Sequence, residues 1–408
     1  MIISLAVLLL FLFFYFKNKD KCILLMGIWF PTLYLFSIGR IKVFSILVFI
    51  IAINLSVSKW KKIASFPCKY AFLVCITSYI MTNTIDNHPR LLAENLSYYI
   101  FPLILWVGYN DKCITLHRFI IRNLLIYCSI ISLYGICEAL TASNPILNML
   151  RNFNVFETEQ RADYFRFGLY RAQSLTIWCS CFGTVCCFYL LLLLHVSILQ
   201  KKRHFIIFNS KDYLIMTGLF VCVFICGTRS VISMFAISTV SFIPYFYTRT
   251  KKIIIYTIPI LVLLVVFPDF FNNVYDSFVH HEQTGGSSIE LREIQLEASL
   301  FYLNKSYLWG NGLGYVGIAE SMDNLLYGAE SIIFKVMIDR GIVGLVSIAI
   351  LWISMLIFVM RKLNIFGGFL VLGFALGKLM SALLGIPETY LLFILIPLYK
   401  MKEYVESN

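Results

Sequence analysis

Charged residues are scarce in this chain of 408 residues. Asp, Glu, Lys and Arg together make up only 14% of it, whereas 60% of its residues are hydrophobic. Soluble globular proteins carry about a quarter charged residues, so this composition excludes a soluble nuclear, secreted or cytosolic enzyme. Aromatic residues make up 16% of the chain, and the amphipathic rings of Trp and Tyr suit the two interfaces of a membrane. The composition therefore predicts a polytopic membrane protein.

The usual signatures of metal and cofactor sites are also missing. No Cys-x-x-Cys pair is present, and most of the twelve cysteines lie inside apolar runs, where free cysteine behaves as a small hydrophobic residue. The His280-His281 pair and the acids Glu157 and Glu159 are the weak metal candidates, and a solvated loop is the favoured interpretation of the histidine pair. We therefore expect no metal and no cofactor.

The net charge of +12 indicates membrane topology rather than nucleic-acid binding. Basic clusters fall on alternate loops, which the positive-inside rule assigns to the cytoplasmic face. They are Lys17/Lys19/Lys21, Lys59/Lys61/Lys62, Lys112/Arg118/Arg122, Lys201/Lys202/Arg203, Arg249/Lys251/Lys252, Arg361/Lys362 and Lys400/Lys402. The short basic pair Arg40/Lys42 falls on the wrong side of this arrangement.

Apolar segments predict an all-α fold with 12–13 transmembrane helices. They lie at about 2–16, 22–38, 43–58, 66–82, 96–109, 119–140, 174–196, 212–227, 230–247, 253–267, 341–360, 364–385 and 389–399. The first has no Ala-x-Ala-like cleavage site and is interpreted as a retained helix. The chain 1–408 is expected to form a single membrane domain. Its two elaborated outer loops are 141–173 and 268–329, the second containing short helices.

Arginines gather in the first outer loop. They are Arg151, Arg161, Arg166 and Arg171. The positive-inside rule disfavours arginine on the outer face of a membrane protein. The guanidinium group of arginine presents a planar fork of hydrogen-bond donors that matches phosphate. Arg166 and Arg171, just before a span, are therefore candidate diphosphate ligands. The alternative is interfacial anchoring beside the neighbouring aromatic residues.

A third arginine, Arg229, lies in the short turn Gly227-Thr-Arg-Ser230 between two predicted spans. Placing arginine below the headgroups costs a few kcal/mol, so such a residue usually faces a cavity or a partner. Diphosphate binding and structural pairing are both open for Arg229. Lys378, inside an apolar segment, has the same two alternatives.

The second outer loop contains a helical pattern over 289–301, preceded by Gly285-Gly-Ser-Ser288. Its apolar stripe consists of Leu291, Ile294, Ala298 and Phe301. Arg292 lies in the first turns, where the helix dipole does not favour a cation. It is a candidate catalytic residue, and the alternative is a local pair with Glu293 or Glu297.

Gly310, Gly312 and Gly314 follow this helical pattern. Glycines there allow close backbone approach and can open amides to an anion, and the alternative is a flexible turn. A Rossmann fingerprint is rejected because no parallel strand precedes the glycines.

Glu330 opens a predicted helix that continues into a span. A carboxylate there is a candidate general base for a sugar hydroxyl, or an acid stabilised by the helix dipole. Lys335 and Asp339 in the same helix are four residues apart and are expected to pair.

These motifs, in this order, resemble the O-antigen polymerase/ligase superfamily of bacterial membrane enzymes. The matching pieces are Arg166-Phe-Gly168, Thr228-Arg-Ser230, Arg292, Gly310-Asn-Gly312, Glu330-Ser331 and Gly341-Ile-Val-Gly344. Ligases typically have a histidine where this chain has Glu330, so the chain is most similar to the Wzy-type polymerases. The proline that members commonly have after the arginine–glycine stretch is absent, and Gln173 lies nearby.

The resemblance implies a GT-C-like, metal-independent, inverting glycosyltransferase of the bacterial inner membrane, active at the periplasmic face in lipopolysaccharide biosynthesis. It would transfer a growing glycan from undecaprenyl diphosphate onto the non-reducing-end sugar of a new lipid-linked repeat unit. Expected partners are undecaprenyl-diphosphate-linked glycans and membrane lipids. A chain-length regulator and a flippase are further candidates, and no nucleic acid is expected. The alternatives are a ligase that joins glycan to lipid A-core and a lipid-linked oligosaccharide flippase.

Overall fold

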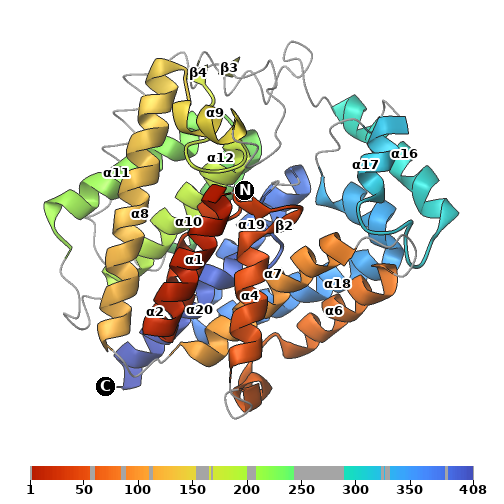
Figure 1. Ribbon diagram of the computed structural model, residues 1–408. Helices are drawn as coiled ribbons and strands as arrows, with labels where there is room; N and C mark the ends of the chain where they lie inside the picture. Colours follow the sequence, from red (N-terminus) through yellow and green to blue (C-terminus); the bar gives the residue numbers. More distant parts are fainter. Residues whose placement is uncertain are drawn as a thin grey trace.

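A computed structural model describes residues 2–55, 60–83, 89–109, 114–152, 165–166, 169–199, 208–242, 289–322, 326, 331–381 and 385–407. This part of the chain is almost entirely helical (Figure 1). Its strands form two short antiparallel hairpins, β1–β2 and β3–β4. The all-α prediction is confirmed.

The elements of the N-terminal half run from α1 to β4. They are α1 (Ile2–Lys17), α2 (Lys19–Ile28), α3 (Phe30–Leu33), β1 (Ser37–Ile38), β2 (Ile41–Lys42), α4 (Val43–Asn54), the 3₁₀ helix η1 (Lys61–Ser65), α6 (Lys69–Asn83), α7 (Pro89–Gly108), α8 (Ile114–Thr141), α9 (Pro145–Asn152), β3 (Phe165–Arg166) and β4 (Leu169–Tyr170).

In the C-terminal half every regular element among the described residues is a helix. Its elements are α10 (Cys179–Leu199), α11 (Ser210–Ile225), α12 (Arg229–Thr239), η2 (Val240–Phe242), α16 (Ile289–Lys305), α17 (Tyr315–Met322), α18 (Ile332–Lys362), η5 (Ile365–Gly367), α19 (Gly368–Met380) and α20 (Tyr390–Ser407). In Figure 1 α16 and α17 lie beside α18 at one edge of the helical array, and the C-terminus lies at the end opposite β3–β4 and α9.

Within the described residues, α7, α8, α10 and α18 are long and apolar enough to cross a membrane. Shorter apolar helices accompany them, among them α1, α4, α6 and α12. Most predicted apolar segments coincide with one of these helices, because the hydrophobic runs that membrane burial requires are also good helix formers. The predicted segment at 253–267 lies outside the described residues.

The predicted apolar segment 22–38 is not one helix. It breaks at Trp29, whose backbone (φ −89°, ψ 5°) leaves the helical region between α2 and α3. Pro31 follows at the start of α3, and a proline cannot continue the hydrogen bonding of a preceding helix. The chain then turns back through the β1–β2 hairpin, where Gly39 adopts φ +59°. This hairpin carries Lys42 of the basic pair Arg40/Lys42, the pair that does not fit the predicted arrangement of basic clusters on the cytoplasmic face.

Aromatic side chains fill the core between α3, α4, α7 and α20. Phe30 makes an edge contact with Phe44 at 4.7 Å between ring centroids, and Phe101 does so with Phe393 at 4.8 Å. Such edge-to-face pairs contribute about 0.5–1.5 kcal/mol each beyond the area they bury. The core fixes α7 and α20 side by side, and therefore also the polar residues they carry.

Helices α12 and α19 pack closely in antiparallel directions. A Cβ on Gly373 of α19 would lie 2.8 Å from the carbonyl oxygen of Met234 in α12, so the glycine is needed for the approach. The 3₁₀ helices η2, after α12, and η5, before α19, are also in contact. The N-terminus of α12 therefore lies beside the C-terminus of α19. We call this place the α12–α19 end, defined by Arg229 on α12 and by Lys378–Met380 on α19.

Helix α18 is broken at Gly341 (φ 59°, ψ −156°), a backbone region that essentially only glycine adopts. The segment 307–312 is inserted at the break. The amides of Asn311 and Gly312 donate to the carbonyls of Ile338 and Asp339 at 2.9 and 3.0 Å. In the opposite sense, the amides of residues 342 and 343 donate to the carbonyls of residues 307 and 308 at 3.1 Å each. The polar groups freed by the break are thus satisfied within the protein, as an apolar surrounding requires.

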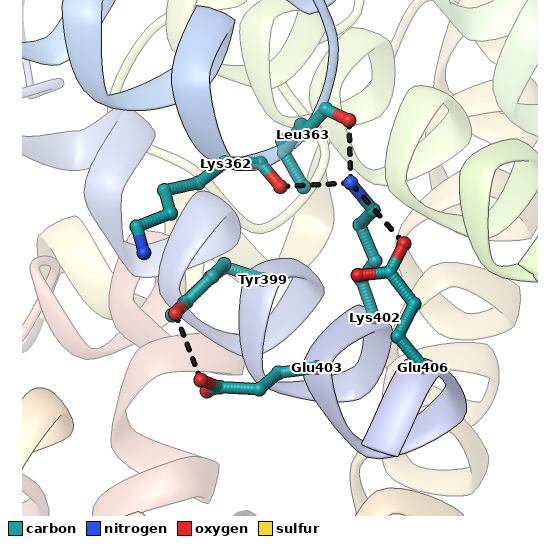
Figure 2. A network of polar contacts seen from close by, with 6 residues as sticks. All are labelled: Lys362, Leu363, Tyr399, Lys402, Glu403 and Glu406. Atoms are coloured by element: carbon teal, nitrogen blue, oxygen red, sulfur yellow. Dashed lines mark hydrogen bonds and ion pairs between the residues drawn. The ribbon is translucent and has the colours of Figure 1, made fainter. Parts of the chain in front are cut away.

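The other end of α18 is capped by α20. Lys402 Nζ donates to the carbonyls of Lys362 and Leu363 at 2.9 and 2.6 Å and lies 3.5 Å from a Glu406 oxygen (Figure 2). In the same network Tyr399 donates to Glu403 at 3.0 Å. A cation satisfies the free carbonyls of a helix C-terminus and complements its dipole. This basic end therefore lies at the start of α19, away from the α12–α19 end.

Helix α16 confirms the helical pattern over 289–301 but buries a different face from its apolar stripe. Ile294 and Phe301 are 38% and 60% exposed, whereas Gln295 and Ser299 are buried. Tyr302, on the same buried face, packs with Ile338 of α18 and Ala319 of α17. Tertiary packing on a membrane helix has therefore overridden the stripe that the sequence suggested.

We expect Gly341→Ala to destabilise the protein by about 1–3 kcal/mol or more, because alanine is strained in this backbone region. Its Cβ would also lie 2.6 Å from the Gly310 nitrogen and the Leu308 oxygen. The matched control is Gly317→Ala in α17, where no atom lies within 4 Å of the added Cβ. Thermal unfolding in detergent measures both, and equal midpoints for the two variants would contradict the constraint at the break.

Candidate functional site

Arg171 is held against the turn that precedes α12. Its Nη2 donates to Thr228 Oγ1 at 3.2 Å, and its Nε to the carbonyl of Cys226 at 3.5 Å. A Cβ on Gly227 would lie 2.9 Å from Arg171 Cγ, so the glycine makes room for the side chain. Two predicted motifs, the one that ends at Arg171 and the Gly227–Ser230 turn, thus form one unit.

The chain after Arg171 is fixed by a buried acid of α8. One Glu138 oxygen, Oε2, accepts from the amides of Gln173 and Ser174 at 3.1 and 2.6 Å. Asn144 Nδ2 donates to the Ser174 carbonyl at 3.0 Å. Ser174 itself adopts φ +51°, a conformation that these bonds stabilise. Glu138 therefore positions Arg171 through the backbone.

Arg229 is the first residue of α12 and is half-buried. A cation gains nothing from the dipole at a helix N-terminus, so helix formation does not explain its position. Thr228, just before it, lies with its hydroxyl 3.9 Å from Cys179 Sγ at the start of α10. The arginine is therefore presented where α10, α12 and the Arg171 segment meet.

Arg292 reaches the same region from the second outer loop. Its Nη2 donates to the carbonyl of Met380, the last residue of α19, at 2.9 Å. Because α12 and α19 are antiparallel, this contact brings Arg292 to the α12–α19 end, where Arg229 lies. A local pair of Arg292 with Glu293 or Glu297 would lie within one helix, and it would not explain this contact with α19.

Lys378 adds a buried cation two residues before Met380. Its side chain is 2% exposed, and its Nζ donates to the carbonyl of Ile386 in the segment that leads into α20. Glu388, two residues further on, interacts electrostatically with Lys378. The α12–α19 end thus combines arginines and a lysine from different elements, an arrangement suited to a ligand with several negative charges.

Arg340, beside the α18 break, is buried with 2% exposure. Its Nη2 donates to the Gly344 carbonyl and to Ser347 Oγ at 3.1 and 2.6 Å. The guanidinium lies over the Tyr79 ring at 3.9 Å from the centroid. Cation–π contact and electrostatic interaction with Glu388 offset part of the cost of burying this charge.

The glycine-rich loop opens its amides to an anion, but that anion is a side chain of the protein. The amides of Gly314 and Val316 donate to the Asp339 carboxylate oxygens at 3.0 and 2.8 Å. Gly310, Gly312 and Gly314 all adopt positive φ, at +74°, +112° and +83°. This geometry favours the turn interpretation of the loop over phosphate binding. Lys335 interacts electrostatically with Asp339, as their spacing predicts.

Several residues singled out in the sequence lie outside the described residues. These are Glu330, Arg161, Glu157, Glu159, His280 and His281. Arg166 lies in β3, paired with Leu169 of β4, and its side chain is not described. Arg151 Nη1 donates to Asn148 Oδ1 at 3.1 Å within α9.

Sequence reasoning missed the positioning acid Glu138 and the buried Arg340. Both lie within or beside long apolar runs of the printed sequence. An ionisable residue inside a span is a functional or structural partner by default, so this signal was available. In the described part of the chain, no group of three or more His, Cys, Asp or Glu side chains could hold a metal ion.

Compared with models of known protein families and with curated proteins, the chain matches none.

We expect Asp339→Asn to loosen the glycine-rich loop. The amide side chain keeps one acceptor oxygen, so one of the two loop amides loses its partner, and a hydrogen bond to a charged group contributes about 1.5–3 kcal/mol. Hydrogen exchange should therefore accelerate by about tenfold or more at residues 314–316. Glu293→Gln, on an exposed position of α16, should leave the exchange unchanged. Unaltered protection in the Asp339 variant would contradict this role of the carboxylate.

Proposed function

We propose that the protein is a Wzy-type O-antigen polymerase, a GT-C-like membrane glycosyltransferase with 12–13 spans. The observation that carries the proposal is the bond from Arg292 to Met380. It joins the second outer loop to the α12–α19 end, where Arg229 lies and which Arg171 approaches through Thr228. Residues far apart in the sequence, and expected from the resemblance to bind diphosphate, thus converge on one place.

The charge at this place suits the diphosphate of a lipid-linked glycan. Guanidinium groups stay protonated and present donors in a fork that matches phosphate oxygens. Arg171 follows β4 and is bound to the turn that precedes Arg229, and Arg292 comes from another element, so together they can surround a diphosphate rather than touch one side. Fixed cations stabilise the charge that develops on the leaving group without reorganising during the reaction.

The proposed reaction needs no metal. The acceptor hydroxyl oxygen attacks the anomeric carbon of the growing glycan, and the bond from that carbon to the diphosphate oxygen breaks. Undecaprenyl diphosphate leaves with the electron pair, held by Arg171, Arg229 and Arg292, with Arg166 as a further ligand. Glu330 accepts the hydroxyl proton. Displacement on the opposite face inverts the anomeric configuration.

The basic end of the helices supports a periplasmic site in the inner membrane. Arg361, Lys362, Lys400 and Lys402 lie where α18 and α20 meet, and Figure 2 shows part of this region. The positive-inside rule assigns this end to the cytoplasm. The α12–α19 end, at the other end of α19, then faces the periplasm, where lipid-linked repeat units are polymerised.

We expect Arg292→Ala to lower the rate of polymerisation by about 10²–10³-fold, because it removes a donor from the leaving group. The measurement is the glycan ladder and its rate of growth in membranes of a polymerase-deficient host. Glu297→Gln on the same helix is the control, because it removes the partner that the local-pair interpretation requires. Equal activity of Arg292→Ala and wild type, or an equal loss in Glu297→Gln, would remove Arg292 from the mechanism.

We expect cells that express Glu330→Gln to carry lipid A-core capped with single repeat units only. The reason is that loss of a general base lowers the rate by about 10²–10⁴-fold. Wild type expressed in the same host should restore the full ladder. Ladders with both proteins would keep the polymerase and exclude Glu330 as the base. Absence of a ladder with well-expressed wild type, in a host that makes the matching repeat unit, would contradict the proposed function and favour a ligase or a flippase.

A further inference from the structure

A buried carboxylate of α7, Glu94, has unequally satisfied oxygens. It is 9% exposed. The hydroxyls of Tyr34 and Tyr98 both donate to the same oxygen, Oε1, at 2.9 and 2.6 Å. Within the described part of the chain, no hydrogen bond reaches Oε2. This second oxygen is not among the fully buried polar atoms that lack a partner, so it is open to a hydrogen-bond donor from outside.

A lysine lies next to the same pair. Lys42 Nζ is placed over the Tyr34 ring at 4.5 Å from the centroid and interacts electrostatically with Glu94. Burial lowers the pKa of Lys42, and the nearby Arg90 lowers it further, against the raising effect of Glu94. Lys42 belongs to the basic pair that the topology places on the outer face. Its ammonium adds hydrogen-bond donors beside the acceptor oxygen of Glu94.

This cluster lies at the same end of the bundle as the arginines. A Cβ on Gly385 would lie 3.8 Å from a Tyr34 ring carbon and 3.7 Å from Cys181 Sγ at the start of α10. Thr389 donates to the Tyr98 carbonyl at 2.7 Å. Between these two contacts, Ile386 accepts from Lys378. The segment 385–389 therefore has the Glu94 cluster on one side and the α12–α19 end on the other.

The chemistry of the cluster suits a sugar hydroxyl. A hydroxyl donates one hydrogen bond and accepts others, so it can donate to Glu94 Oε2 and accept from Lys42. An ionised diphosphate has no hydrogen to donate to the Glu94 carboxylate, which distinguishes this cluster from the arginines. A small number of placed polar groups beside an aromatic ring is typical of sites that orient a ligand.

We propose that Glu94, Tyr34 and Lys42 form a binding subsite for hydroxyls of the acceptor sugar. The proposal rests on the proposed function, because it assigns the acceptor of that reaction to a place beside the diphosphate ligands. Glu94 and Lys42 orient the sugar by hydrogen bonds, and Tyr34 fixes the Glu94 carboxylate. No bond is made or broken at this subsite, and the hydroxyl proton goes to Glu330 as before.

Glu94→Gln separates binding from a purely structural role. Glutamine has nearly the same shape, and its carbonyl oxygen can still accept from both tyrosines. Its amide nitrogen replaces the second oxygen by a donor and removes the negative charge. The matched control is Glu403→Gln, which alters another tyrosine–glutamate pair, at the basic end of the molecule (Figure 2).

The test uses the full-length protein in proteoliposomes with lipid-linked repeat units from polymerase-deficient cells of the parent strain. The free repeat-unit oligosaccharide, released from that lipid by mild acid, is the competitor, since it carries hydroxyls but no diphosphate. We expect the half-inhibitory concentration of this oligosaccharide to rise by about tenfold or more in Glu94→Gln. The reason is that the sugar loses one hydrogen bond to a charged group. Glu403→Gln should behave as wild type.

Each other outcome has a distinct meaning. Failure of wild type to form polymer overturns the proposed function, and this inference with it. Polymerisation by wild type with unchanged inhibition in Glu94→Gln overturns the subsite alone, as does a wild type that the oligosaccharide does not inhibit. If Glu94→Gln does not give a monodisperse protein, Lys42→Met carries the test. It removes the donors from a half-buried position at the start of α4, and unchanged inhibition in that variant overturns the subsite.

Discussion

The break in α18 is the constraint on which the outer part of this structure depends. A backbone that leaves the helix inside an apolar surrounding exposes donors and acceptors that lipid cannot satisfy. Here the segment 307–312 supplies partners for both sides of the break at Gly341, with bonds of 2.9 to 3.1 Å. Because Gly310 and Gly341 approach backbone to backbone, neither position has space for a side chain.

The insertion determines where α16 lies. This helix ends at Lys305, directly before the inserted segment, and Asn311 Nδ2 ties the insertion back to the carbonyl of Tyr302 in α16 at 3.0 Å. α16 is therefore held against α18, with Arg292 near its start reaching Met380. The glycine-rich loop thus contributes to the candidate site indirectly, by placing an arginine rather than by binding phosphate.

Much of the helical framework could be predicted from the sequence, because a long apolar run buried in a membrane has to satisfy its backbone hydrogen bonds internally, and a helix does so. The break at Trp29 was not predicted, although Pro31 in the sequence is a signal for the end of a helix. The arginines were identifiable from their position on outer loops, yet the sequence could not pair Arg292 with Met380, 88 residues away. The partner of the glycine-rich loop was missed for the same reason. Asp339 was assigned to its neighbour Lys335, because only the fold brings Gly314 and Val316 to its carboxylate.

Hydrogen-bond satisfaction separates the buried charged groups into two kinds. Asp339 and Glu138 each accept from two backbone amides, and this gives them a structural role without any further ligand.

Arg340 and Glu94 instead keep polar atoms without a hydrogen bond among the described residues. For Arg340 these are Nε and Nη1. The Tyr79 ring and Glu388 offset the Arg340 charge from inside the bundle, whereas Glu94 interacts electrostatically with the neighbouring Lys42. The physical difference is that Arg340 is already compensated by fixed groups, while the second oxygen of Glu94 gains its hydrogen bond only from a ligand or solvent. A satisfied acid holds the backbone in place, and an acid with an open oxygen beside a lysine is suited to recognise a hydroxyl.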